Sequence, residues 1–171
     1  MQAPPPTVTV AALADKVRRA EAVPQSDVRF FFGVTEEAHL HALRDLWTNS
    51  SEEIQRLKAR CSGVKAYLDH STGDQKIAGD LIEELFKLCG ELQIPLIAHC
   101  EDPETNAKAA SSISDTNVSA HSSMRPPESE AIAIQKAITL AEKCATRLHV
   151  AHLSTKQGID LMPVSYTHLT L

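Results

Sequence analysis

Two histidines close short apolar runs in different parts of the chain. His99 ends the run at residues 94–99, and His152 ends the run that begins at Leu148. Neutral imidazole is the commonest side-chain metal ligand, and α/β proteins carry out chemistry at the open carboxyl ends of parallel strands. Either histidine alone is more often a hydrogen-bonded core residue than a ligand. Together, at the ends of two parallel strands, they predict a metal site.

Lys65 is unusual because it stands in the middle of an apolar run, between Val64 and Ala66. Lysine is seldom fully buried without a partner, so one interpretation is an edge lysine whose amine reaches water. Base rates favour that interpretation for an isolated residue. In the other, Lys65 points inward beside His99 and His152. A deprotonated lysine amine can then take up carbon dioxide as a carbamate that bridges two metal ions.

The neighbours of the two histidines allow further distinctions. His149 lies three residues before His152, and this odd spacing in a strand predicts side chains on opposite faces. Only one of the two can then enter the site, and we assign that place to His152. Cys100 follows His99 directly, so the same alternation points it away from the site. We interpret Cys100 as a small buried hydrophobic residue rather than a ligand or nucleophile.

Four other polar residues have two interpretations each. His70 and His121 fall in predicted loops, where they either touch a substrate or are ordinary exposed histidines. Glu101 and Asp102 follow His99 closely. They either accept hydrogen bonds from the ring N–H groups of the ligand histidines or begin a solvated loop.

Composition narrows the class of protein. The 171 residues are 43% hydrophobic and 23% charged with a net charge of -5, which fits one soluble domain or part of a larger one and does not favour a nucleic-acid partner. No apolar run approaches the roughly 20 residues that cross a membrane, and the N-terminus lacks the features of a signal peptide. The four cysteines form no CxxC pair. We therefore expect reduced thiols and a cytoplasmic protein.

Hydrophobic periodicity predicts an alternation of strands and helices. Apolar runs predict strands at residues 28–32, 63–68, 94–99 and 148–153, and helical spacing predicts helices at 7–22, 36–47, 50–60, 77–89, after 127 and at 154–161. Gly90 suits the C-terminal cap of the fourth helix. The polar stretch at 101–127 is long for a connection, which favours a working loop over a site. Near-continuous apolar strands in this order predict an α/β fold with a parallel sheet covered on both faces.

Five motifs in order carry a resemblance to a known family. They are residues 63–68 around Lys65, 71–73, 98–102 around His99, 121–126 with Glu130, and 149–155 around His152. In this order and spacing they resemble the dihydroorotase branch of the amidohydrolase superfamily, whose close relatives are allantoinases and dihydropyrimidinases. The resemblance covers roughly residues 1–162.

The resemblance implies a partial TIM-type (β/α)8 barrel of about four units and a two-zinc centre that acts on a small-molecule substrate. Lys65 would be the carboxylated lysine that bridges the metals, and His99 and His152 would be ligands of the second zinc. We expect His121 and Arg125 to contact substrate. Dihydroorotases interconvert carbamoyl-aspartate and dihydroorotate in pyrimidine biosynthesis. A metal-bridging hydroxide is the nucleophile in this chemistry.

Several family features are absent. The His-x-His pair, the arginine after it and the catalytic aspartate strand are missing, and a full barrel needs about 250 residues. The first hypothesis is therefore a dihydroorotase fragment, inactive alone; an allantoinase or hydantoinase fragment and a non-catalytic dihydroorotase-like subunit are the alternatives. Unpaired edge strands favour self-association, including a homo-oligomer. Residues 163–171 do not match the family and resemble translated adapter sequence, so we expect the native domain to end at 162 and exclude His168 from the site.

Overall fold

The chain forms a four-stranded parallel sheet with strands in the order β1-β2-β3-β4. The computed structural model describes residues 5–23, 25–70, 75–114 and 117–166, the last four of these in backbone only. The strands are β1 (Phe30–Gly33), β2 (Cys61–Tyr67), β3 (Leu96–His99) and β4 (Leu148–Val150). The predicted parallel α/β architecture is confirmed. The motif at 71–73 and residues 167–171 of the tail lie outside the described residues.

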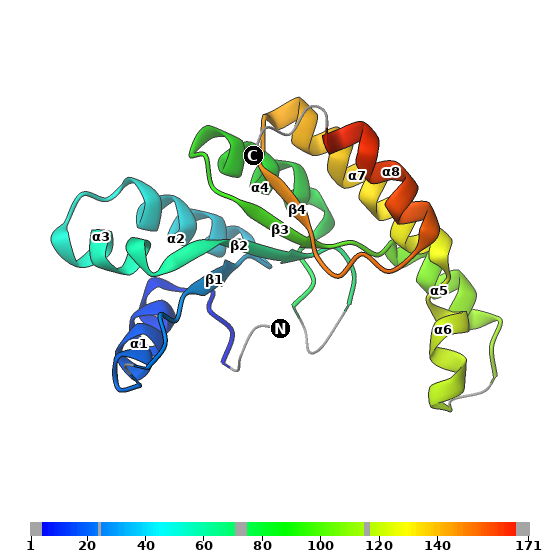
Figure 1. Cartoon of the computed structure of the whole chain (residues 1–171), viewed down its shortest axis with the longest axis horizontal. Coiled ribbons are helices and arrows are strands. Elements are labelled where there is room, and N and C mark those ends of the chain that lie inside the picture. Colours follow the sequence, from blue (N-terminus) through cyan, green and yellow to red (C-terminus); the bar gives the residue numbers. More distant parts are fainter. Residues whose placement is uncertain (1–4, 24, 71–74, 115–116, 167–171) are drawn as a thin grey trace.

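Helices connect the strands in regular alternation (Figure 1). They are α1 (Val10–Glu21), α2 (Glu37–Thr48), α3 (Glu52–Ala59), α4 (Ile82–Glu91), α5 (Pro103–Ser111), α6 (His121–Met124), α7 (Pro127–Cys144) and α8 (Lys156–Tyr166), with short 3-10 turns η1 (Gly79–Leu81) and η2 (Val118–Ala120). Figure 1 shows α4 and α7 along one side of β3 and β4, with α8 beside α7. Among the described residues, no helix combines the length and apolar character that a membrane span requires.

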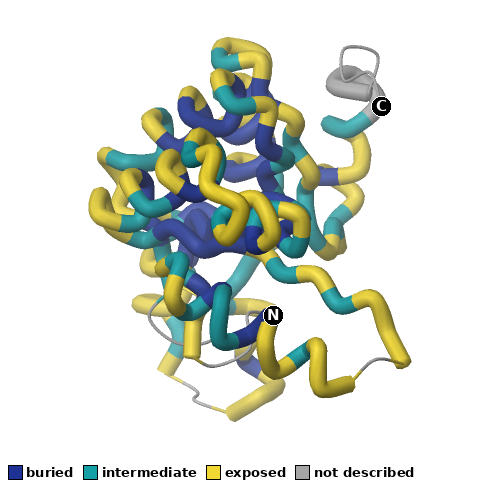
Figure 2. Tube along the Cα trace, turned by 90° about the vertical axis from the view of Figure 1, so that its left-hand side faces the viewer, coloured by how far each residue is buried: buried dark blue, intermediate teal, exposed yellow. Residues whose placement is uncertain are grey.

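The two faces of the sheet differ in burial. Val64, Ala66 and Leu68 belong to the hydrophobic core, together with Phe32 and Leu96. Alternation along the strands places the residues between them on the opposite face, which we call the inner face. Figure 2 shows the buried segments gathered in the sheet and the adjoining sides of the helices.

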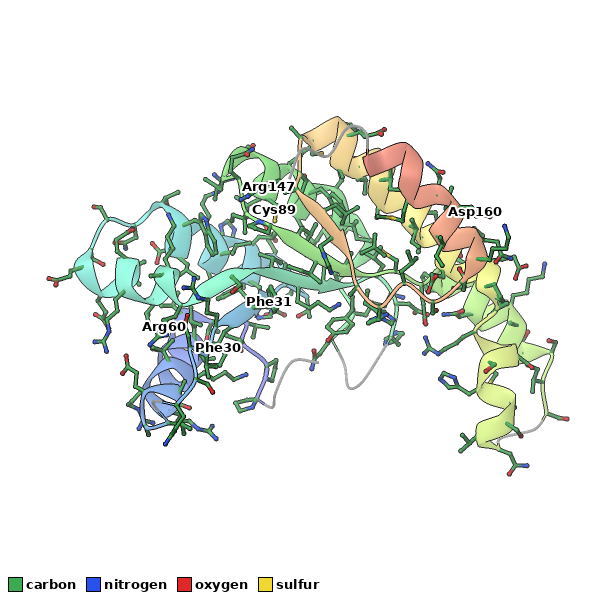
Figure 3. The ribbon with its side chains drawn as sticks, in the orientation of Figure 1. Phe30, Phe31, Arg60, Cys89, Arg147 and Asp160 are labelled. Atoms are coloured by element: carbon green, nitrogen blue, oxygen red, sulfur yellow. The ribbon has the colours of Figure 1, made fainter. Side chains whose placement is uncertain are left out.

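The inner face is partly open to solvent. Phe31 is paired with Gly63, which puts it on this face, and it is 40% exposed. Figure 3 shows Phe31 on the opposite side of the sheet from Cys89, which is fully buried on α4. The helices of this chain therefore cover one face of the sheet, and the prediction that both faces are covered is wrong. The inner face carries the polar residues described below.

Three predicted boundaries are wrong. The stretch 101–127 contains α5, η2 and α6 instead of a long loop. Asp102 starts α5, because its side chain accepts a hydrogen bond from the Thr105 amide and Pro103 follows at the first helical position. Strand β4 ends at Val150 rather than 153, and α8 continues past Leu161 to Tyr166.

Gly90 is not a helix cap, as the sequence suggested, because α4 continues through it to Glu91. Its role is packing. A Cβ atom on Gly90 would lie 1.9 Å from the backbone oxygen of Cys144 at the end of α7. The close approach of α4 to α7 therefore requires a residue without a side chain at this position.

Candidate metal centre

The two histidines selected from the sequence are in direct contact. The Nδ1 atom of His99 lies 2.9 Å from the Nε2 atom of His152, and the two rings meet edge to face. Two nitrogens bound to one zinc ion at about 2.0–2.1 Å with a tetrahedral angle lie roughly 3.3 Å apart. The pair would therefore need to open by only a few tenths of an ångström to share one metal ion.

His152 reaches His99 by a route that strand alternation did not predict. β4 ends at Val150, and His152 itself has a positive φ of 40°, in the left-handed region. His149 is in register with Ile97, which is in register with Lys65, so His149 lies on the inner face. His152 does contact His99, and its role as a metal ligand stays a prediction. The argument that excluded His149 from this face is wrong.

Lys65 lies on a central strand and is 8% exposed, so it is not an edge lysine that extends to water. Tyr67 is two residues further along β2 and pairs with His99, which places Lys65, Tyr67 and His99 on the same face. The Lys65 ammonium lies 5.0 Å from the centroid of the Tyr67 ring. Burial lowers the pKa of Lys65.

The electrostatics keep both imidazoles neutral at pH 7. Burial, followed by the positive charges of Lys65 and Arg125, lowers the pKa of His99 to about 4. Burial and the adjacent His99 lower the pKa of His152, and Lys65 acts in the same direction. Lys65 lies on the same face of the sheet as His99, which contacts His152. Neutral imidazole is the form that binds a metal.

Glu101 faces the other side of the His99 ring. Its Oε2 atom lies 3.7 Å from the Nε2 atom of His99, which is buried and has no hydrogen-bond partner among the described residues. The Arg125 guanidinium forms an ion pair with Glu101, and Asn106 donates to the same carboxylate at 3.1 Å. Glu101 is thus held near His99. This position is expected if Glu101 accepts a hydrogen bond from the ring of a metal-binding histidine.

Asp102 and Cys100 have structural roles. The Asp102 carboxylate caps α5 through Thr105 and accepts a hydrogen bond of 2.7 Å from Lys136 on α7. Cys100 is buried in the hydrophobic core, as predicted. Burial raises the pKa of its thiol to about 12, so it is protonated and unreactive at neutral pH.

The surroundings of His121 and Arg125 give little support to the prediction that they contact substrate. His121 is exposed on α6, which extends away from the sheet in Figure 1. Arg125 pairs with Glu101 and donates at 3.0 Å to the backbone oxygen of His70. Its positive charge is therefore already matched by a carboxylate. Contact of either residue with substrate stays a prediction.

The donor set fits part of a zinc site. Within the described ranges, no group of three or more His, Cys, Asp and Glu side chains is placed to hold a metal ion. His99 and His152 offer two neutral nitrogens that already face each other, and Lys65 is a buried amine whose pKa is lowered. Two imidazoles and a carbamate oxygen are suitable zinc ligands. The residues present are thus compatible with the metal role predicted for them.

Sequence reasoning assigned no role to Glu130, although this residue belongs to one of the recognised motifs. Its carboxylate accepts hydrogen bonds from both Ser154 and Thr155, directly after His152. The serine and threonine indicated only the start of a helix. Their partner lies on a different helix, α7, and nothing local in the sequence marks that pairing.

Comparisons with known proteins find relatives over most of this chain. A dihydroorotase from Halobacterium salinarum is 31% identical over 156 residues, which cover 91% of this chain and 34% of that protein. An allantoinase from Enterococcus faecalis is 29% identical over 167 residues, covering 91% of this chain and 34% of its own length. This chain is related to the cyclic amidohydrolases. No protein-family model matches it.

Solved structures show the same fold. The L-hydantoinase from Arthrobacter aurescens superposes with a TM-score of 0.77 at 21% identity, covering 96% of this chain and 35% of the hydantoinase. The dihydropyrimidinase from Brevibacillus agri gives a TM-score of 0.71 at 16% identity and covers 98% of this chain. The predicted partial TIM-type barrel is confirmed. The chain spans about a third of the length of the relatives it matches.

Proposed function

We propose that this chain is the part of a zinc-dependent cyclic amidohydrolase that carries the ligands of one metal, and that the whole enzyme is a dihydroorotase. The contact of 2.9 Å between His99 and His152 carries the proposal. It joins two residues from separate motifs, one at the end of β3 and one just beyond the end of β4, and the lowered pKa of each ring favours the neutral form.

In this proposal, His99 and His152 would hold a zinc ion, and the carbamate of Lys65 would supply a further ligand oxygen. The lowered pKa of Lys65 supports the carbamate, because only the deprotonated amine reacts with carbon dioxide. Bound zinc supplies Lewis-acid polarisation of the amide carbonyl and activation of water. The residues of this chain orient the ligands. Glu101, supported by Arg125, lies beside the outer nitrogen of the His99 ring.

Metal binding tests this proposal directly. The chain is titrated with zinc in competition with a chromophoric chelator, and His99→Ala and His152→Ala are each expected to lower the zinc affinity strongly. His41→Ala is the matched control, because His41 is exposed on α2 and away from the pair. If both single variants bind zinc as the unmodified chain does, the proposed metal centre is wrong.

Turnover tests the substrate. We expect no turnover of dihydroorotate by this chain alone with zinc, because the relatives are about three times as long and the recognised motifs omit the His-x-His pair and the catalytic aspartate. Turnover of dihydroorotate by the longest reading frame at the source locus would support the proposal. Its absence there, with zinc bound, would reject dihydroorotase. A role in pyrimidine biosynthesis follows from this proposal and is tested with it, and a cytoplasmic location stays a separate prediction.

A second candidate is an allantoinase or hydantoinase. The allantoinase from Enterococcus faecalis matches the same share of this chain as the dihydroorotase from Halobacterium salinarum, at a similar identity. Assays of the same reading frame with dihydroorotate, allantoin and hydantoin distinguish the three activities. Preference for allantoin or hydantoin would favour this second candidate.

A further inference from the structure

The carboxylate of Glu130, on the first turn of α7, gathers four donors from the segment that follows His152. Ser154 donates through its hydroxyl at 2.6 Å and its amide at 3.2 Å, and Thr155 donates through its hydroxyl at 2.8 Å and its amide at 2.9 Å. A carboxylate has about four lone-pair sites, so this one segment uses the full acceptor capacity of Glu130.

The first turn of α8 packs closely against this carboxylate. A Cβ atom on Gly158 would lie 2.7 Å from the Oε1 atom of Glu130 and 2.7 Å from the side chain of Leu153. The Gly158 amide donates to the Thr155 hydroxyl at 3.0 Å. The first turn of α8 therefore closes over Glu130, and it does so because residue 158 has no side chain. The contact therefore joins α7 closely to the segment that connects β4 to α8.

The charge of Glu130 acts on both candidate ligands. Burial opposes its ionisation, but the hydrogen bonds from Ser154 and Thr155 outweigh burial, so the pKa of Glu130 lies below its ordinary value. The resulting negative charge raises the pKa of His99 and of His152, against the larger effect of burial. Its field thus favours positive charge at the histidine pair, which includes the charge of a metal ion.

His152 lies beyond the end of β4, so hydrogen bonds of the sheet do not hold it in place. The last sheet-like hydrogen bond joins the Ala151 amide to the Ala98 oxygen at 2.9 Å. His152 follows with a positive φ, a conformation that is unfavourable for a residue with a Cβ atom. Further along the chain, Ser154 and Thr155 hold the segment in place by donating hydrogen bonds to the Glu130 carboxylate.

We propose that Glu130 is a positioning residue for the metal centre: its carboxylate holds residues 154–155 and thereby keeps the His152 ring against His99. This inference rests on the proposed function, in which the two histidines bind zinc. Glu130 does not contact the metal in this account. It acts through the backbone of the segment on which His152 stands.

Zinc affinity of the full chain tests the proposal. Glu130→Gln keeps the shape of the side chain but turns two of its acceptor positions into donors that face other donors. We expect 10- to 100-fold weaker zinc binding, the usual effect of losing a group that orients a ligand. Glu128→Gln removes the same charge from the same turn of α7 and is expected to leave affinity unchanged. Equal zinc affinity in both variants would overturn the proposal.

A second measurement, on the metal-free chain, separates this inference from the proposed function. Glu130→Gln is expected to speed amide hydrogen exchange at residues 151–155 and to shift the ring 15N signals of His152, whereas Glu128→Gln does neither. A merely structural role would lower the melting temperature without moving the His152 ring signals. Unchanged ring signals in Glu130→Gln would therefore overturn the inference.

A negative result in each measurement rejects a different hypothesis. If the unmodified chain does not bind zinc, the proposed metal centre fails, and the metal-free measurement still decides whether Glu130 positions His152. Ser154→Ala provides a milder test if Glu130→Gln does not fold, since it removes one hydroxyl donor and keeps the amide. It should shift the His152 signals in the same direction, by a smaller amount, and unchanged signals would count against the proposal.

Discussion

Acidification should destabilise the metal-free chain through His99. The pKa of His99 in the folded chain is about 4, against 6.5 for a free histidine, because of burial first and then the charges of Lys65 and Arg125. Between these two values the unfolded chain binds a proton that the folded chain does not. The stability that neutral His99 contributes is therefore complete above about pH 6.5 and is lost as the pH falls towards 4.

The size of this effect follows from the pKa difference. One pKa unit corresponds to about 1.4 kcal/mol, so a shift from 6.5 to about 4 corresponds to roughly 3 kcal/mol of unfolding free energy. His152 acts in the same direction, because its pKa is also lowered. This is a large part of the roughly 5–15 kcal/mol that stabilises an ordinary domain, so the effect should be easy to measure.

Urea unfolding of the chain in the presence of a chelator, at several pH values between 4.5 and 7.5, measures the effect. Carboxylates also titrate in this range, so the informative quantity is the difference between the unmodified chain and His99→Gln. We expect that difference to change by about 2–3 kcal/mol across the range. His41→Gln, at an exposed position of α2, should retain the unmodified profile. If His99→Gln and the unmodified chain have parallel profiles, the described environment of His99 is wrong.

Three further predictions follow from the packing and the polar contacts. Gly90→Ala should lower the unfolding free energy by about 2 kcal/mol or more, since its Cβ would meet a backbone oxygen at 1.9 Å, whereas Gly79→Ala, with no atom within 4 Å, should change it by less than about 1 kcal/mol in urea unfolding. With zinc and 13C-bicarbonate, the chain should show a carbamate signal by 13C NMR that Lys65→Met lacks; a signal that persists in Lys65→Met would place the carbamate elsewhere. Arg125→Gln should weaken zinc binding in the absence of substrate, because it frees Glu101 from its ion pair. Unchanged zinc affinity with weaker dihydroorotate binding would instead assign Arg125 to the substrate.

Local patterns were sufficient for the four strands and most helices, but not for α5 and α6 or for the end of β4. The apolar runs around Lys65 and His99 predicted parallel strands correctly, because strand burial depends on neighbouring residues in the chain. The same alternation predicted that Cys100 lies in the core, beside a histidine on the inner face. The contact between His99 and His152 was also expected, since parallel strands end at one edge of the sheet.

Tertiary structure decided what lies beyond the strand ends. His152 follows β4 and itself has a left-handed backbone conformation. The segment after it donates hydrogen bonds to Glu130, which lies more than twenty positions earlier, on α7. The need for glycine at position 90 depends on how α4 and α7 approach each other. The pairing of Arg125 with Glu101 likewise depends on how the segments after α6 and after β3 approach each other. The sequence by itself determined which residue types stand where strands end. Only the packing of distant segments decided which groups hold those residues in place, because contacts between such segments follow no local periodicity.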